Sequence, residues 1–256
     1  MECVPYILIS YTLLIKNMFQ VKNLYKSIHK KQILKDISFK LNAGEITVVL
    51  GPSGSGKTTL MRTLAKLEPY DSGYIFLDDT PLKAVPASKI GMVFQGFSLF
   101  PHLTVLENLT LAPIKVMEQT RKTAAKKAMN LLEQFGLADK VEVTPGNLSG
   151  GQKQRVAMCR TLMMEPALLM MDEPTSALDP EMVKDVAEFI QTLRNKDRSM
   201  LIVSHELRLA QLCADRVFFM DEGVLLDDLS KEDFFDPLHQ KVSKRGAEFL
   251  ENYMAR

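Results

Sequence analysis

Two hydrophobic patterns recur along the chain, and each predicts a different kind of strand. Apolar and polar residues alternate in Phe19–Tyr25 and Asp36–Leu41, as in strands with one buried face. Ile46–Leu50 and Leu168–Met171 are short continuous apolar runs, which are typical of strands buried on both faces. Further strands are predicted at Ser72–Leu77, Lys89–Gln95, Met200–Val203, and in a hairpin of Val217–Met220 with Val224–Leu226.

Segments with a helical period separate these strands. They are Thr58–Lys66, Leu106–Phe135, Gln152–Met163, Glu181–Asn195 and Glu206–Ala214. Their alternation with strands predicts an α/β fold in which a parallel sheet is flanked by helices. Arg121–Gln134 places Lys and Arg opposite its apolar face, which favours a solvated surface over a nucleic-acid surface.

Composition narrows the class of protein further. The 256 residues suit one large α/β domain or a core domain with an inserted lobe. Hydrophobic residues make up 46% of the chain and charged residues 25%, as in ordinary globular proteins. A net charge of +1 gives no electrostatic reason to expect nucleic acid as a partner. Cys3, Cys159 and Cys213 match no metal-binding spacing and are predicted to be reduced thiols.

The N-terminal residues include a short apolar stretch. Val4–Ile15 is shorter than the about 20 residues that a membrane span needs. It has neither the basic region nor the small-residue cleavage site of a secretory signal. Residues 1–17 are therefore predicted to be an extension, disordered or translated from an upstream start codon, with a peripheral membrane contact as the alternative.

A phosphate-binding loop follows the apolar strand Ile46–Leu50. Its sequence matches G-x-x-x-x-G-K-[ST], in which glycines let backbone N–H groups surround a phosphate. The following helix adds partial positive charge. Lys57 is predicted to reach the β- and γ-phosphates, and the Thr58 hydroxyl to bind Mg²⁺. The nucleotide-binding residues predicted here are Gly51, Pro52, Ser53, Gly54, Ser55, Gly56, Lys57, Thr58 and Thr59.

Two carboxylates end the apolar strand Leu168–Met171, which the prediction places next to the strand of the phosphate loop. Asp172 is expected to face the metal through its water shell, and Glu173 to polarise an attacking water. Two surface acids at a strand end are common in isolation. Their pairing with a phosphate loop favours the functional interpretation.

A second glycine-rich loop, Leu148–Gln152, also opens a predicted helix and can therefore meet an anion. One active site does not need two such loops. With this pentapeptide the chain resembles the nucleotide-binding subunit of ATP-binding cassette (ABC) transporters, in which the segment closes over the ATP held by another subunit. The resemblance runs from about Phe19 to the C-terminus. It implies that Ser149, Gly151 and Gln152 contact the nucleotide of a partner.

Other motifs of that family can be placed one by one. Gln95 occupies the position of the glutamine loop. The resemblance implies that its side chain contacts the metal and the nucleotide. Ser176–Asp179 matches the segment that crosses the dimer interface, with Asp179 at its end. His205 follows the strand Met200–Val203, in the place of the switch histidine. The segments Phe97–Asn108 and Asp172–Pro180 are most similar to those of polar amino-acid uptake importers.

Three positions depart from the family pattern. Gly96 stands where these importers often carry a second glutamine, and Thr144–Asn147 stands where a Tyr-Pro pair is common. The usual adenine-stacking aromatic aligns with Ile28. Tyr25 is the nearest aromatic but is out of register, so the identity of the adenine contact stays open between Ile28 and Tyr25.

The resemblance implies a domain over residues 18–256, with a P-loop core, a small antiparallel N-terminal subdomain and a helical lobe at about 97–160. It implies an ATPase that uses Mg²⁺ and pairs head to tail with a second copy. Catalysis is expected from Glu173, His205, Lys57 and Gln95. Implied partners are a membrane permease and an extracytoplasmic solute-binding protein, with the chain at the cytoplasmic face of the membrane and no nucleic acid involved.

Three alternatives remain at this stage. A soluble P-loop phosphotransferase has no use for Leu148–Gln152. An ABC protein acting on DNA or ribosomes usually carries a long coiled-coil insertion or two cassettes, and this sequence has neither. An exporter or another importer branch also fits the motifs. The sequence does not identify the transported solute, because solute contacts belong to other subunits.

Overall fold

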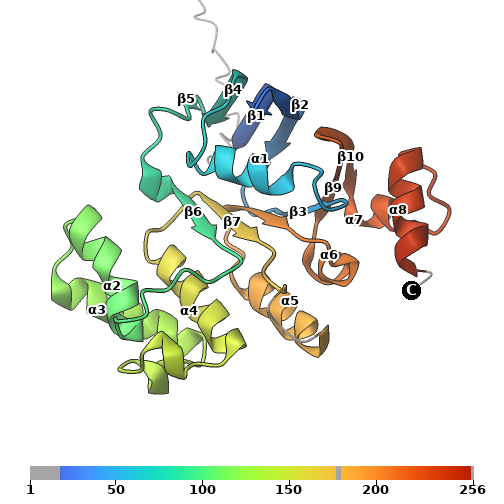
Figure 1. The fold of residues 1–256 in the computed structure, drawn as a ribbon. Helices are drawn as coiled ribbons and strands as arrows, with labels where there is room; N and C mark the ends of the chain where they lie inside the picture. Colours follow the sequence, from blue (N-terminus) through green and yellow to red (C-terminus); the bar gives the residue numbers. More distant parts are fainter. Residues whose placement is uncertain (1–17, 177–179, 255–256) are drawn as a thin grey trace, which may run out of the picture.

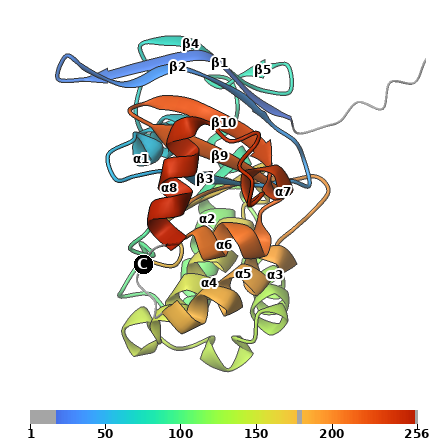
Figure 2. The same ribbon diagram turned by 90° about the vertical axis from the view of Figure 1, so that its right-hand side faces the viewer.

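Two β-sheets lie one above the other in the computed structural model, which describes residues 18–176 and 180–254. The N-terminal extension and Asp179 lie outside the described residues. The smaller sheet is antiparallel, with strand order β2-β1-β4-β5. Figures 1 and 2 show it above the larger sheet, with α1 between the two layers. Its strands are β1 (Phe19–Ile28), β2 (Lys31–Leu41), β4 (Ser72–Leu77) and β5 (Thr80–Pro81).

The hairpin of β1 and β2 is longer than the alternation predicted. The two strands pair up to Ile28 and Lys31, so only His29 and Lys30 form the turn. Both turn residues have positive φ, 48° and 65°, as a type I′ turn requires. Neither residue is glycine, and this is why the sequence did not signal the turn.

The larger sheet has the order β10-β9-β3-β8-β7-β6, and all its pairs are parallel except the terminal hairpin of β9 and β10. The predicted parallel sheet and hairpin are thus confirmed. The expectation that the carboxylate-bearing strand lies next to the phosphate-loop strand is wrong, because β8 lies between β3 and β7. The strands are β3 (Ile46–Leu50), β6 (Ile90–Val93), β7 (Leu168–Asp172), β8 (Ser199–Val203), β9 (Arg216–Asp221) and β10 (Val224–Ser230).

Helices cover the larger sheet and extend from it as a lobe. The helical stretch Leu106–Phe135 is two helices rather than one. The chain breaks at Glu118, whose φ is 54°. The Thr120 hydroxyl then caps the second helix by accepting a hydrogen bond from the backbone N–H of Thr123. The helices are α1 (Lys57–Leu64), α2 (Val105–Val116), α3 (Arg121–Gln134), α4 (Gly150–Leu162), α5 (Val183–Thr192), α6 (Leu207–Cys213), α7 (Lys231–Phe234) and α8 (Lys244–Met254). None of these described helices is long and apolar enough to cross a membrane.

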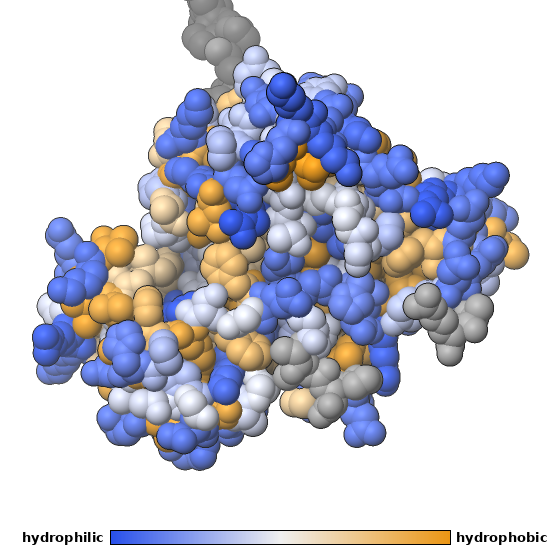
Figure 3. Space-filling view, viewed as in Figure 1, coloured by the Kyte–Doolittle hydropathy of each residue, from blue (hydrophilic) through white to orange (hydrophobic). Residues whose placement is uncertain are grey.

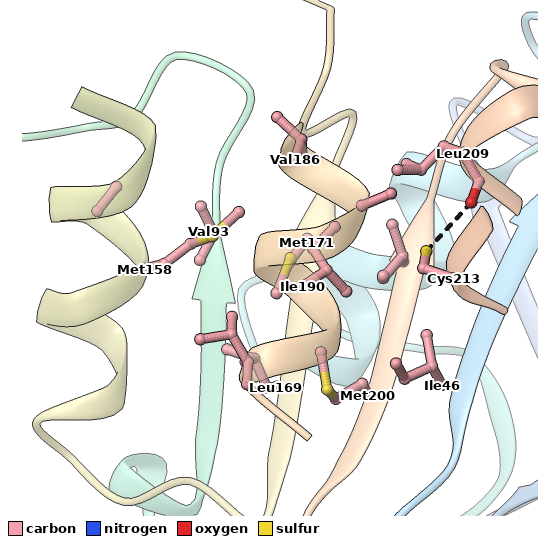
Figure 4. Close-up of a cluster of buried hydrophobic side chains, with 14 of the residues drawn as sticks. Ile46, Val93, Met158, Leu169, Met171, Val186, Ile190, Met200, Leu209 and Cys213 are labelled. Atoms are coloured by element: carbon pink, nitrogen blue, oxygen red, sulfur yellow. Dashed lines mark hydrogen bonds between the residues drawn. The ribbon is translucent and has the colours of Figure 1, made fainter. Parts of the chain in front are cut away.

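Alternate residues of the central strands pack into two hydrophobic clusters, one on each face of the larger sheet. On β3, Val48 joins the cluster under α4–α6, while Val49 joins the cluster toward α1. Leu169 and Met170 of β7 divide in the same way. Figure 4 shows the first cluster between the strands and the helices. The continuous apolar runs are therefore buried on both faces, as predicted.

Two cysteines belong to that first cluster. Cys159 and Cys213 are free and buried, and burial raises the pKa of each thiol to about 12. The Cys213 thiol donates to the Leu209 carbonyl within α6 (Figure 4). These two side chains are inert packing residues, because the reactive form of a cysteine is the thiolate.

Candidate functional site

The carboxyl ends of four strands meet at one cleft of about 580 Å³. Gln95 follows β6, Glu173 follows β7, His205 follows β8, and the glycine-rich loop follows β3. In open α/β sheets this edge is where ligands bind. The residues that line the cleft are Ile33, Ser53, Gly54, Gly56, Lys57, Thr58, Thr59, Gln95, Glu173 and His205.

The glycine-rich loop has a backbone that side chains would not tolerate. Gly51 has φ of 146°, and a Cβ there would lie 2.0 Å from the carbonyl oxygen of Met220. Gly56 has φ of 101°, and its Cβ would lie 3.0 Å from the carbonyl oxygen of Ile33. The loop therefore fits tightly against β2 and β9, and it leads into the N-terminus of α1, where backbone N–H groups favour an anion.

Lys57 is held inside the same loop. Its ammonium donates to the carbonyl oxygens of Gly51 and Pro52, both at 2.8 Å, and to the Ser55 hydroxyl at 3.3 Å. Burial lowers the pKa of Lys57, while the nearby carboxylates, Glu173 foremost, raise it. A cation is therefore fixed among carbonyl groups at the point where the loop can receive a phosphate.

Asp172 is the most buried carboxylate of the site, with 8% of the residue exposed. Its Oδ1 has no hydrogen-bond partner among the residues that the structure describes. Burial raises the pKa of Asp172, and Glu173 adds to the effect, while a hydrogen bond from Thr58 lowers it in part. This buried, unpartnered oxygen and the Thr58 hydroxyl suit a divalent cation, because such cations prefer oxygen ligands.

Glu173 and His205 contact one another across the ends of β7 and β8. The Nδ1 atom of His205 lies 2.8 Å from Oε2 of Glu173. Glu173 has φ of 51°, and its backbone N–H donates to the Val203 carbonyl at 2.9 Å. An unusual backbone conformation thus directs the Glu173 side chain into the cleft, where a carboxylate and an imidazole can exchange or hold a proton.

The second glycine-rich loop lies outside this cleft, at the N-terminus of α4. The Gln152 N–H donates to the Ser149 hydroxyl at 3.3 Å, and the Ser149 N–H donates to the Gln152 side chain at 2.9 Å. The two residues form a capping box. A Cβ at Gly151 would lie 2.8 Å from Cε of Met182, the flexible end of that side chain, so a small residue there would need only a shift of Met182.

The structure gathers Gln95, Lys57, Glu173 and His205 in the cleft but leaves Ile28 out of its lining. Ile28 lies at the end of β1 with 36% of its surface exposed, and Ile33 of β2 lines the cleft instead. Ile33 was missed because the alternation signal started only at Asp36. A longer strand, with the turn at His29 and Lys30, would have indicated it.

Comparison with known proteins agrees with this geometry. Residues 34–176 match the sequence profile of the family described as "ABC transporter". The glutamate/aspartate import ATP-binding protein GltL of Escherichia coli strain K12 is 45% identical over 91% of this chain and 98% of its own length. The arginine transport ATP-binding protein ArtM of Bacillus subtilis strain 168 is 45% identical over 93% of this chain and all of its own.

Solved structures show the same architecture. The dimeric ATP-binding cassette MJ0796, bound to ADP and Pi in a post-hydrolysis state, is 28% identical, with a TM-score of 0.72 over 83% of this chain and 98% of that chain. The cassette MJ1267 in its ADP conformation shares the fold, with a TM-score of 0.78, 24% identity and coverage of 94% and 99%. With the P-loop cleft and these similarities together, the chain belongs to the ATP-binding subunits of the ABC transporter family.

Proposed function

We propose that this chain hydrolyses ATP in a head-to-tail homodimer and thereby powers the uptake of polar amino acids through a separate membrane permease. The observation that carries the proposal is the convergence of the P-loop, Gln95, Glu173 and His205 in one cleft. Relatives 44–45% identical to the chain are named for the import or transport of glutamate and aspartate, arginine, and glutamine. The related cassette MJ0796 is a dimer.

Within the cleft, each side chain has a distinct task. Lys57, His205 and the P-loop N–H groups would hold the γ-phosphate and stabilise the charge that develops as water attacks in line. Glu173 would act as the general base that takes the proton of this water. Its contact with His205, 2.8 Å between Nδ1 and Oε2, keeps base and phosphate ligand side by side.

Mg²⁺ would be held by Thr58, Gln95 and Asp172. The unpartnered Oδ1 of Asp172 and the adjacent Thr58 hydroxyl fit this cation. In the described part of the chain, no three His, Cys, Asp or Glu side chains cluster tightly enough to hold a metal alone. Phosphate oxygens of the nucleotide would complete the ligands of Mg²⁺, and the bound cation would neutralise phosphate charge.

The second half of each site would come from the partner. Ser149, Gly151 and Gln152 lie outside the cleft of their own chain, at the start of α4. In a head-to-tail pair, the N-terminus of the partner's α4 would approach the γ-phosphate and contribute its partial positive charge.

A groove of about 740 Å³ beside the lobe is the proposed docking surface for the permease. It runs between β6 and α2, and Figure 3 shows apolar side chains at this side of the molecule. Phe100 and Val116 line it with exposed side chains, as expected where a partner covers apolar surface. The complex would place this chain at the cytoplasmic face of the membrane and would take its solute from an extracytoplasmic binding protein.

Glu173→Gln tests the proposed reaction. We expect ATP turnover to fall by at least about a hundredfold, because the base is lost, while ATP binding stays intact. Since hydrolysis reopens the pair, ATP with Mg²⁺ should then hold the variant as a stable dimer in size-exclusion chromatography. Glu188→Gln, an exposed acid on α5, is the matched control and should behave as the wild type. Wild-type turnover by a monomeric Glu173→Gln protein would refute the assignment.

A further inference from the structure

The C-terminal helix α8 is firmly attached to the sheet that carries the site. Leu250 is completely buried in the hydrophobic cluster under the larger sheet. The ring of Phe249 packs against Phe219 of β9, with centroids 5.2 Å apart. Figure 2 shows α8 standing along β9 and β10 with its last turn beside α6. Side chains on this helix therefore have defined positions relative to the cleft.

At its last turn, α8 contacts the segment that carries His205. The Tyr253 hydroxyl lies 3.0 Å from Oε2 of Glu206, the residue that immediately follows His205. Burial, and then the hydrogen bond to Glu206, raise the pKa of Tyr253. The hydroxyl thus stays protonated and donates its hydrogen bond to the carboxylate.

Glu206 occupies the position before the first residue of α6, yet its carboxylate does not cap that helix. Residues there usually satisfy the free N–H groups of the first turn. The Glu206 carboxylate instead bridges two other side chains. One oxygen accepts from Tyr253, and the other lies 3.8 Å from Nε2 of His205.

His205 consequently lies between two carboxylates. Glu173 is next to its Nδ1, at 2.8 Å, and Glu206 is next to its Nε2. More than half of the His205 side chain is exposed, 55%, so packing alone does not fix the ring. Its orientation depends on these two carboxylates, and the orientation of Glu206 depends in turn on Tyr253.

The first turn of α8 is tied to the other wall of the cleft. Arg245 donates to Asp221, at the end of β9, over 2.6 Å. The turn that follows Asp221 bonds to the P-loop, where the Gly223 N–H donates to the Ser55 carbonyl at 3.0 Å. The two ends of one helix thus reach the P-loop side and the histidine side of the site.

We propose that Tyr253 is a positioning residue for ATP hydrolysis, which orients the His205 ring through Glu206. Tyr253 is not among the residues that line the cleft, and α8 serves as the rigid support from which it acts. The inference rests on the proposed ATPase function. It adds a determinant of turnover that lies outside the cleft, in a helix that the sequence patterns did not predict.

Tyr253→Phe tests this inference in the full-length chain, because it removes the hydroxyl and keeps the ring. We expect kcat to fall about three- to tenfold, the range that corresponds to one lost hydrogen bond, with the ATP dissociation constant unchanged. Asn252→Ala is the control on the neighbouring position. Within the described residues its amide donates to the Glu248 carbonyl of the same helix and to no residue near the cleft, so kcat should stay at the wild-type value.

A double-mutant cycle separates positioning from general stability. If Tyr253 acts through Glu206, Tyr253→Phe should have no further effect on kcat in a Glu206→Ala background. Independent, multiplying losses in the two variants would overturn the inference, as would an unchanged kcat in Tyr253→Phe. A fall in ATP affinity that matches the fall in kcat would overturn it too.

Ring spectra of His205 give a measurement that does not depend on hydrolysis. The chain has four histidines, so NMR of the imidazole groups is tractable, and His205→Gln assigns the signal. Tyr253→Phe should shift the His205 ring resonances while Asn252→Ala leaves them in place. If Tyr253→Phe shifts the His205 resonances but the wild-type protein has no ATPase activity, the proposed function alone is contradicted. Unchanged resonances in an active protein would contradict the role of Tyr253 alone.

Discussion

Two glycine-rich loops precede helices in this chain, and their backbones depend on glycine to different degrees. In the loop before α1, Gly51 and Gly56 have positive φ and lie against backbone carbonyls of β9 and β2. In the loop before α4, Gly151 has no such backbone conformation, and a Cβ there would meet only the flexible end of Met182. The first loop needs glycine for its backbone shape, whereas the backbone of the second loop makes no such demand at Gly151.

The surroundings of the two loops differ as well. The loop before α1 opens into a cleft supplied with Lys57, Glu173 and His205 from the same chain. At the loop before α4, Ser149 and Gln152 satisfy each other's backbone N–H groups. One loop thus belongs to a cleft that its own chain lines with charged side chains, whereas the other is a closed helix cap, for which we propose a role against a partner. This difference can be tested at either loop.

Ser149→Arg should have the largest effect that separates the two loops. The new side chain would occupy the space where the partner's γ-phosphate docks, so ATPase activity should fall at least about a hundredfold, or about 2.7 kcal/mol. ATP binding to the monomer, measured by calorimetry, should be unchanged. Lys57→Ala is the contrasting variant, since it should weaken monomer binding itself. Loss of monomer affinity in Ser149→Arg would place Ser149 in the site of its own chain.

Asp172→Asn should stabilise the nucleotide-free chain by about 1 kcal/mol, or about 2–4 °C in Tm, because it removes a buried charge with an unpartnered oxygen. Burial raises the folded-state pKa of Asp172 above its unfolded value. Its contribution to stability is therefore fully present below the unfolded pKa and is lost as pH rises through the folded pKa. The gain from Asn should be larger at neutral pH than at mildly acidic pH.

Thermal melts in the presence of a chelator measure this gain. Asp185→Asn is the control near the other loop, where the side chain is exposed at the start of α5. Loss of the Asp185 charge should leave Tm unchanged or slightly lower, because an acidic side chain near the N-terminus of α5 stabilises that helix. Equal stabilisation by both variants would mean that the charge of Asp172 carries no special penalty.

Ile28→Tyr should have the smallest effect, confined to the choice of base. Ile28 and Ile33 offer apolar contact but no aromatic face, so the triphosphate and Mg²⁺ should supply most of the affinity. In the wild type, GTP should then compete with ATP within about one order of magnitude. A tyrosine adds a stacking surface worth ~1–3 kcal/mol and should tighten ATP more than GTP in competition binding. Strong wild-type selectivity that Tyr25→Ala abolishes would show that Tyr25 is the adenine contact.

The residues of the candidate site were largely readable in the sequence because they belong to contiguous motifs. Gly51–Thr58 and Leu148–Gln152 each carry their residue types at fixed local spacing, and a strand or helix boundary next to them sets their direction. The buried strands were equally clear, since burial on both faces demands an unbroken apolar run. The type I′ turn and the break at Glu118 were hidden, because non-glycine residues adopt positive φ there.

The sequence by itself determined the buried strands, most of the helices, the local motifs and the α/β class, since these follow from periodicity and short-range backbone preference. Only the tertiary structure decided which strand ends meet. It inserted β8 between β3 and β7, so that His205 lies between the P-loop and Glu173, and it set α8 against the site. The physical reason is that strand order and helix docking depend on the fit of whole buried faces, which no local pattern records.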